Sequence, residues 1–175
     1  MRVISGKYKG RKIHVESKTD YRPTLTRIRE DIFNLLSHNN DLNIDLNEVI
    51  LCDLFAGTGS IGIEALSRGV KKVIFNDIEK KHTDKIEKFL KKINEENYEI
   101  INIDPYKQKI EILDSCQLIY IDPPYDHSFE LIKKKILDKI NSNILVIYEC
   151  INLIDIQNVI FRKQYKNKNL FFFKT

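Results

Sequence analysis

A glycine-rich turn flanked by acidic residues offers the first chemistry in the sequence. Gly57-Thr58-Gly59-Ser60-Ile61-Gly62 has the pattern G-x-G-x-x-G and joins an apolar run to a helical one. Asp53 closes the apolar run, and Asp77 ends the next one, about 20 residues beyond the glycines. Glycines let the backbone approach a ligand closely, and a carboxylate can accept hydrogen bonds from two ribose hydroxyls. The pattern predicts a site for an adenosine-containing ligand; a tight strand-to-helix turn is the alternative.

The surrounding acids favour S-adenosylmethionine over a dinucleotide as that ligand. Asp53 would face a pyrophosphate unfavourably, but it could accept hydrogen bonds from a ligand ammonium group. The 175 residues also leave little room for a second mononucleotide half and a substrate domain. S-adenosylmethionine has no phosphate and carries an ammonium and a sulfonium, so acids around a glycine loop suit it. Asp104 closes the following apolar run, where it could receive an adenine amino group.

A second group, Asp122-Pro123-Pro124-Tyr125, follows a later apolar run and indicates the reaction. Two prolines stiffen the loop, so Asp122, the neighbouring carbonyls and Tyr125 would point one way. An exocyclic base amine is a poor nucleophile because its lone pair is conjugated with the ring. The Asp122 carboxylate and the Pro123 carbonyl could accept both amine hydrogens and aim the lone pair at a sulfonium methyl, while Tyr125 stacks on the base. A rigid turn without chemistry is the alternative.

The elements that must position these residues alternate between strand and helix. Five apolar runs predict strands: 48–55, 71–77, 98–104, 117–122 and 143–150. Three segments between them predict helices: 60–68, 79–93 and 128–140. Near-continuous apolar strands separated by helices indicate a parallel sheet covered on both faces. Two more strand-like runs, 158–164 and 169–174, predict an antiparallel edge because their connection is short.

The N-terminal residues form a basic extension of this α/β unit. Residues 2–15 have the pattern of a β-hairpin, and 25–37 have the apolar spacing of an amphipathic helix. We expect one domain over 1–175, with an extension at 1–40 and a cofactor-binding catalytic core at 48–175. The formal net charge of +4 permits an acidic polymer as partner without requiring one.

Composition excludes several other classes of protein. The chain is 42% hydrophobic and 31% charged, which is ordinary for a soluble globular protein. Its three cysteines lie far apart, so we expect neither disulfides nor a metal site. No signal peptide or membrane-spanning run is visible, which predicts a cytoplasmic protein. Of the four histidines, only His127 falls near the predicted site.

These motifs together resemble the RsmD-like family of 16S ribosomal RNA guanine-N2 methyltransferases, class I enzymes of the [N/D]-P-P-Y group. The likeness rests on residues 2–13, 22–34 and 53–69, on Asp77, Asp104 and DPPY, and on Glu149. It implies a Rossmann-like class I fold with a seven-stranded, mostly parallel sheet. Similar proteins tend to have a Tyr-Gly turn and a small hydroxyl residue where this chain has Tyr165-Lys166-Asn167-Lys168.

The resemblance also implies a cofactor, a substrate and site residues. S-adenosylmethionine would donate the methyl group, and the acceptor would be one guanine of 16S rRNA in the assembling 30S subunit. We expect the protein itself to be a monomer. The residues expected to hold the cofactor are Asp53, Phe55, Gly57, Gly59, Asp77 and Asp104. The catalytic residues would be Asp122, Pro123, Pro124 and Tyr125. The residues expected to contact RNA are Arg2, Lys7, Lys9, Arg11, Arg22, Arg27 and Arg29.

Three alternatives stay open from the sequence. The acceptor amine could be adenine N6 or a protein glutamine, because similar [N/D]-P-P-Y enzymes modify these groups. The protein could also be a noncatalytic RNA-binding assembly factor that keeps the fold. The arginines at 22, 27 and 29 could form an ordinary solvated helix face.

Overall fold

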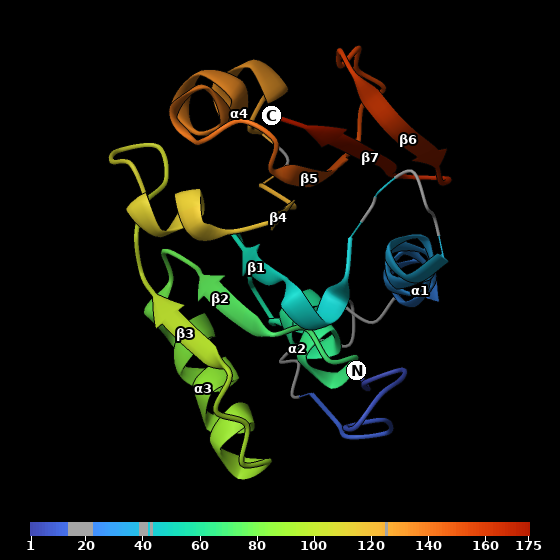
Figure 1. Ribbon diagram of the computed structural model, residues 1–175, viewed down its shortest axis with the longest axis vertical. Coiled ribbons are helices and arrows are strands. Elements are labelled where there is room, and N and C mark those ends of the chain that lie inside the picture. The colour runs from blue at the N-terminus through green and yellow to red at the C-terminus, as the bar shows by residue number, and fades with distance from the viewer. Residues whose placement is uncertain (14–22, 39–41, 43, 125) are drawn as a thin grey trace.

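The computed structural model describes residues 1–13, 23–38, 42, 44–124 and 126–175, with the backbone alone at 23–25 (Figure 1). Its seven strands are β1 (Ile50–Asp53), β2 (Lys72–Asn76), β3 (Tyr98–Ile101), β4 (Leu118–Ile121), β5 (Leu145–Cys150), β6 (Val159–Gln164) and β7 (Asn169–Lys174). The α-helices are α1 (Pro23–His38), α2 (Ser60–Ser67), α3 (Lys80–Lys92) and α4 (Phe129–Lys135). Short 3₁₀ turns are η3 (Leu46–Glu48), η4 (Glu111–Ser115) and η5 (Leu137–Lys139).

All seven strands belong to one sheet in the order β3-β2-β1-β4-β5-β7-β6. The first five strands pair in parallel, and β7 lies antiparallel between β5 and β6. This confirms the predicted mostly parallel sheet with an antiparallel edge. The strand order reverses beside β1, where β4 begins the second half of the sheet, and such a reversal opens a crevice at the carboxyl ends of the strands.

Two hydrophobic cores fill the two faces of the sheet. One core unites the apolar sides of α1, α2 and α3 with alternate strand residues such as Leu51, Val73 and Phe172. The other packs η4, α4 and η5 against the intervening residues, such as Cys52 and Ile74. Because successive strand residues point to opposite faces, near-continuous apolar strands are buried on both sides. Figure 1 shows α2 and α3 together on one side and α4 on the other.

The N-terminal residues turn back as the predicted hairpin does, but they form less strand than predicted. Residues 1–13 make a loop whose arms join through one antiparallel bridge between Arg2 and Lys12 and through 3.0 Å backbone bonds from Val3 to Arg11 and from Ile13 to Met1; residues 14 and 15 lie outside the described residues. The tip of this loop bonds to α2 instead of extending the ladder: the backbone nitrogen of Lys7 donates to the Ser67 carbonyl at 2.7 Å. Gly6 has φ of +80° and lies so close to Ser67 that a side chain would clash with its backbone.

Two other elements differ from the prediction. The helix expected over 128–140 divides at Ile136, whose φ of −123° and ψ of −65° end α4 before η5 begins. The turn η4 was not predicted, since its few apolar residues do not reach one helical repeat. Neither change moves the strand ends that carry the predicted site residues. In the described part of the chain, no helix is both long and apolar enough to cross a membrane.

Candidate active site

Two cavities lie at the carboxyl ends of the strands, and they share Phe55 and Asp122. The larger, about 550 Å³, is lined by Phe55, Asn76, Asp77, Ile78, Glu79, His82, Asp104, Pro105, Tyr106, Asp122, Pro123, Pro124 and His127. The smaller, about 280 Å³, is lined by Met1, Ile28, Asp53, Phe55, Ala56, Gly57, Thr58, Ser60, Ile61, Tyr120, Asp122 and Glu149. The structure thus brings the predicted glycine loop, the three acids and the start of DPPY to one place. Tyr125 lies outside the described residues.

Asp53 is buried where β1 ends. Its Oδ2 accepts a hydrogen bond of 3.0 Å from the backbone nitrogen of Gly62, which fixes the first turn of α2 against β1. Burial raises the pKa of Asp53 to about 7, and nearby Asp122, Asp77 and Glu149 add to the rise while the Gly62 bond opposes it. A cation placed in the smaller cavity would favour the ionised form of this acid.

Asp77 ties the glycine loop to the end of β2. Its Oδ2 accepts from the Gly57 nitrogen at 2.8 Å and lies 3.1 Å from Nδ1 of His82, and its Oδ1 accepts from the Glu79 nitrogen at 2.8 Å. Oδ1 therefore keeps lone-pair capacity for a ligand, and Asp77 lines the larger cavity. His82 was missed by the sequence reasoning; its place five residues beyond the acid, in the first turn of α3, was the available signal.

Asn76 is a second residue that the sequence reasoning missed. Its side chain is buried and makes hydrogen bonds of 3.0 Å to the Leu54 carbonyl, 3.0 Å to the Ile103 carbonyl and 2.9 Å from the Ile103 nitrogen. It therefore joins the segments that follow β1, β2 and β3. A polar residue directly before Asp77, at the end of an apolar strand, was the signal.

Asp104 lies on the far wall of the larger cavity, in a loop that contacts the DPPY loop. The Asp104 carboxylate accepts from the Tyr106 nitrogen at 3.0 Å. The Tyr106 hydroxyl lies 2.7 Å from Nδ1 of His127, and their rings pack edge to face with centroids 4.8 Å apart. The His127 nitrogen donates to the Pro124 carbonyl at 3.0 Å. The Tyr106–His127 pair thus joins the two loops into one wall of the cavity.

Asp122 forms an ion pair with Lys168, which immediately precedes β7. Lys168 Nζ lies 2.9 Å and 2.8 Å from the two Asp122 oxygens and 2.7 Å from Glu149 Oε2. Glu149 also accepts a hydrogen bond from the Tyr120 hydroxyl. Burial raises the pKa of Glu149, and Asp122 adds to the rise, while Lys168 and Tyr120 oppose it. The sequence did not single out Lys168 individually.

The basic residues expected to contact RNA fall into different environments. Arg2, Lys9, Arg11 and Arg27 are exposed, and Lys7 is half-exposed and 2.8 Å from Glu95. Arg22 lies outside the described residues. Arg29 is only 2% exposed, which contradicts its expected role as a surface contact. Its guanidinium donates to the Arg2 carbonyl at 2.8 Å and approaches Glu64 at 3.7 Å.

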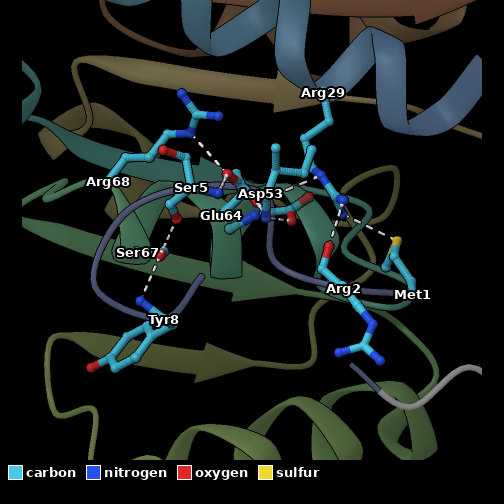
Figure 2. A network of polar contacts seen from close by, with 11 residues as sticks. Met1, Arg2, Ser5, Tyr8, Arg29, Asp53, Glu64, Ser67 and Arg68 are labelled. Atoms are coloured by element: carbon cyan, nitrogen blue, oxygen red, sulfur yellow. Dashed lines mark hydrogen bonds and ion pairs between the residues drawn. The ribbon is translucent and has the colours of Figure 1, made fainter. Parts of the chain in front are cut away.

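Glu64, on α2, is the centre of the network that holds the N-terminal loop (Figure 2). Its buried carboxylate accepts from the backbone nitrogens of Ile4 at 2.8 Å and Ser5 at 3.0 Å, and from Arg68 Nε at 2.8 Å. The network places Met1 at the edge of the smaller cavity. The basic loop and the candidate cofactor site are therefore joined through one helix.

Comparison with known proteins places the chain in a family. The model of a family described as Conserved hypothetical protein 95 matches residues 1–172. Ribosomal RNA small subunit methyltransferase D of Haemophilus influenzae is 35% identical over 130 residues, 71% of this chain and 64% of that protein. The protein of the same name from Buchnera aphidicola subsp. Acyrthosiphon pisum is 37% identical over 135 residues, 77% of this chain and 66% of that protein. The chain therefore spans slightly less than two thirds of these relatives.

Solved structures share the fold across the whole chain. An Escherichia coli protein named yhhF, solved as a candidate methyltransferase, superposes with a TM-score of 0.77 at 21% identity, covering 99% of this chain and 97% of that one. This likeness confirms the expected Rossmann-like class I methyltransferase fold. The strand order, the glycine loop and the match over residues 1–172 agree with the resemblance in the sequence, and the chain belongs to the RsmD-like family.

Proposed function

We propose that this protein transfers a methyl group from S-adenosylmethionine to the N2 amine of a guanine in small-subunit ribosomal RNA. The observation that carries the proposal is the position of Asp122, which lines both cavities together with Phe55. A cofactor spanning the two cavities would pass this carboxylate at its middle. The names of the matched relatives support ribosomal RNA as the substrate.

The residues around the cavities fit this cofactor. Combined, the cavities fall in the size range of small-molecule sites. Asp53 would accept hydrogen bonds from an ammonium group in the smaller cavity, and Asp77 would accept them from ribose hydroxyls in the larger one. Asp104 would receive the adenine amino group, while Phe55 supplies an apolar surface between the two halves. Gly57 and Gly59, both at positive φ, shape the loop that borders the smaller cavity.

The DPPY loop supplies the groups that would act on the amine. When bound, S-adenosylmethionine presents an electrophilic methyl group on a sulfonium. Asp122 would accept one hydrogen of the guanine amine and the Pro123 carbonyl the other, which aims the nitrogen lone pair at that methyl. The side chain of Asp122 is 32% exposed, so a base can reach it. We assign stacking of the base to Tyr125 and loop rigidity to Pro124 on the sequence alone.

The N-terminal extension would position the RNA. We propose that Arg2, Lys7, Lys9, Arg11, Arg22 and Arg27 contact phosphates, with Arg29 left out because it is buried. Such contacts position a nucleic acid without reading its sequence. Within one domain over 1–175, residues 1–40 would then serve as the RNA-contacting extension of the catalytic core at 48–175.

The decisive experiment is tritium transfer from labelled S-adenosylmethionine to 30S subunits that lack the modification, followed by nucleoside analysis. We expect label in N2-methylguanosine, and loss of that label in Asp122→Ala with binding of S-adenosylhomocysteine retained. Asp126→Ala is the matched control, because Asp126 lies on the same loop with an 84% exposed side chain. Label in adenine or in a protein glutamine would redirect the proposal to those amines. RNA binding without any transfer would replace it with an assembly factor.

A further inference from the structure

Lys168 is a buried cation at the proposed reaction site. It is 8% exposed, and its Nζ lies within 2.9 Å of three carboxylate oxygens, two on Asp122 and one on Glu149. An ammonium has three N–H donors, so these three acceptors use its full capacity. The backbone of the segment holds it there, because the Tyr165 nitrogen donates to the Lys168 carbonyl at 2.7 Å.

The charges around Asp122 explain why a cation is needed there. The titratable groups that interact with Asp122 come from four elements or their ends: Asp53 on β1, Tyr120 on β4, Tyr148, Glu149 and Cys150 on β5, and Lys168 before β7. Lys168 is the one cation in this described set. Burial lowers its pKa, but Glu149 and Asp122 raise it by more, so the net direction is upward and the side chain stays charged.

We propose that Lys168 is a positioning residue for methyl transfer, which holds both Asp122 oxygens in place so that Asp122 orients the acceptor amine instead of taking its proton. This inference rests on the proposed function. Two carboxylates that share a site without a cation would bind a proton between them.

The reaction balances with Asp122 in this role. The acceptor nitrogen forms the N–C bond as the S–C bond breaks, and sulfur keeps that bonding pair. The methylated nitrogen then carries a positive charge and releases its proton to water. Lys168 holds both Asp122 oxygens, while the 32% exposure of the Asp122 side chain leaves an edge open to amine and water.

The test compares Lys168→Met, Lys168→Gln and Lys168→Arg with wild type, using kcat and KM from about pH 5 to about pH 9. For the Met and Gln variants we expect kcat to fall by about tenfold or more, with the KM for S-adenosylmethionine changed by less than about threefold. The acid limb of kcat should move to higher pH by about one unit or more, because the carboxylate pair gains a proton. Lys168→Arg keeps the charge and should recover part of kcat. Lys166→Met, at an exposed position in the same segment, should match wild type.

A second readout needs no turnover. Carboxyl-carbon NMR should show the Asp122–Glu149 pair taking up its first proton at a higher pH in Lys168→Gln than in wild type. An unchanged titration and an unchanged acid limb in every variant that folds, even with lower kcat or Tm, would leave Lys168 a purely structural part and overturn the inference. If wild type methylates no amine, the proposed function is wrong. The NMR comparison would still decide whether Lys168 affects proton uptake by the Asp122–Glu149 pair.

Discussion

Asp53 Oδ2 and the backbone nitrogen of Gly62 lie 3.0 Å apart, which binds the end of β1 to the first turn of α2. This carboxylate is 1% exposed, and burial raises its pKa to about 7. The native protein therefore holds a proton on Asp53 that the unfolded chain would release at lower pH. The glycine loop between these two elements is built around an acid that becomes ionised only near neutral pH.

We predict that Asp53→Asn stabilises the ligand-free protein at about pH 8 while weakening cofactor binding. Because the pKa of Asp53 is higher in the folded state, its ionisation does not lower the free energy of unfolding below about pH 4. The full loss of stability is present above about pH 7. A folded-state pKa about three higher than the unfolded one corresponds to roughly 4 kcal/mol as an upper bound. Asn keeps an acceptor for Gly62, so this cost should vanish in urea unfolding above pH 7. The dissociation constant for S-adenosylmethionine should fall with rising pH in wild type and stay flat in the variant.

Asp53→Ala is the control for the hydrogen bond. It removes both the charge and the acceptor for the buried Gly62 nitrogen, so it should be less stable than Asp53→Asn by about 1–3 kcal/mol. Wild-type stability that does not decline between about pH 4 and about pH 7 would contradict a buried, protonated Asp53.

Much of this site follows from the sequence because it depends on local patterns. The apolar runs locate the strand ends, and parallel strands bring Asp53, Asp77 and Asp104 to one edge whatever the packing details. Lys168 and Glu64 could not be found in this way, since most of their partners are distant in the sequence and a lysine between two asparagines looks like part of a solvated turn. Arg29 was misassigned for the same reason: a helical pattern tells apolar from polar faces, but a charged residue at its margin can be buried against a distant carboxylate.

We predict that Tyr106→Phe weakens cofactor binding without affecting stability greatly. The change removes the 2.7 Å contact between the Tyr106 hydroxyl and Nδ1 of His127, which joins the Asp104 loop to the DPPY loop. One such hydrogen bond contributes about 1 kcal/mol, so we expect roughly a fivefold higher dissociation constant for S-adenosylhomocysteine by calorimetry. Tyr98→Phe on β3 is the matched control and should bind as wild type does. Equal affinities of Tyr106→Phe and wild type would show that the pair does not shape the cavity.

We predict that Glu64→Ala is strongly destabilising and releases the N-terminal loop. The substitution removes the acceptor of the Ile4 and Ser5 nitrogens and leaves the Arg29 guanidinium buried without this carboxylate. Breaking a buried charge cluster in this way costs about 3–5 kcal/mol, measurable by urea unfolding. Limited proteolysis should cut within the first residues of the variant and spare wild type. Glu48→Ala removes only an exposed partner of Lys71 and should change stability by less than about 0.5 kcal/mol. A similarly small effect of Glu64→Ala would contradict the network.

The exposed basic residues of the N-terminal loop should set the salt dependence of RNA binding. Lys9 and Arg11 flank Gly10, at the end of the turn in this loop, and both are exposed. If each contacts a phosphate, Lys9→Glu/Arg11→Glu should lower the slope of log K against log salt by about one for each lost contact. Anisotropy titrations with a 16S rRNA fragment between about 50 and 200 mM salt measure this slope. Lys88→Glu/Lys92→Glu makes the same charge change on exposed positions of α3. A defined RNA surface on the N-terminal loop requires the slope to become shallower in Lys9→Glu/Arg11→Glu alone. Equal slopes in the two double variants would contradict such a surface.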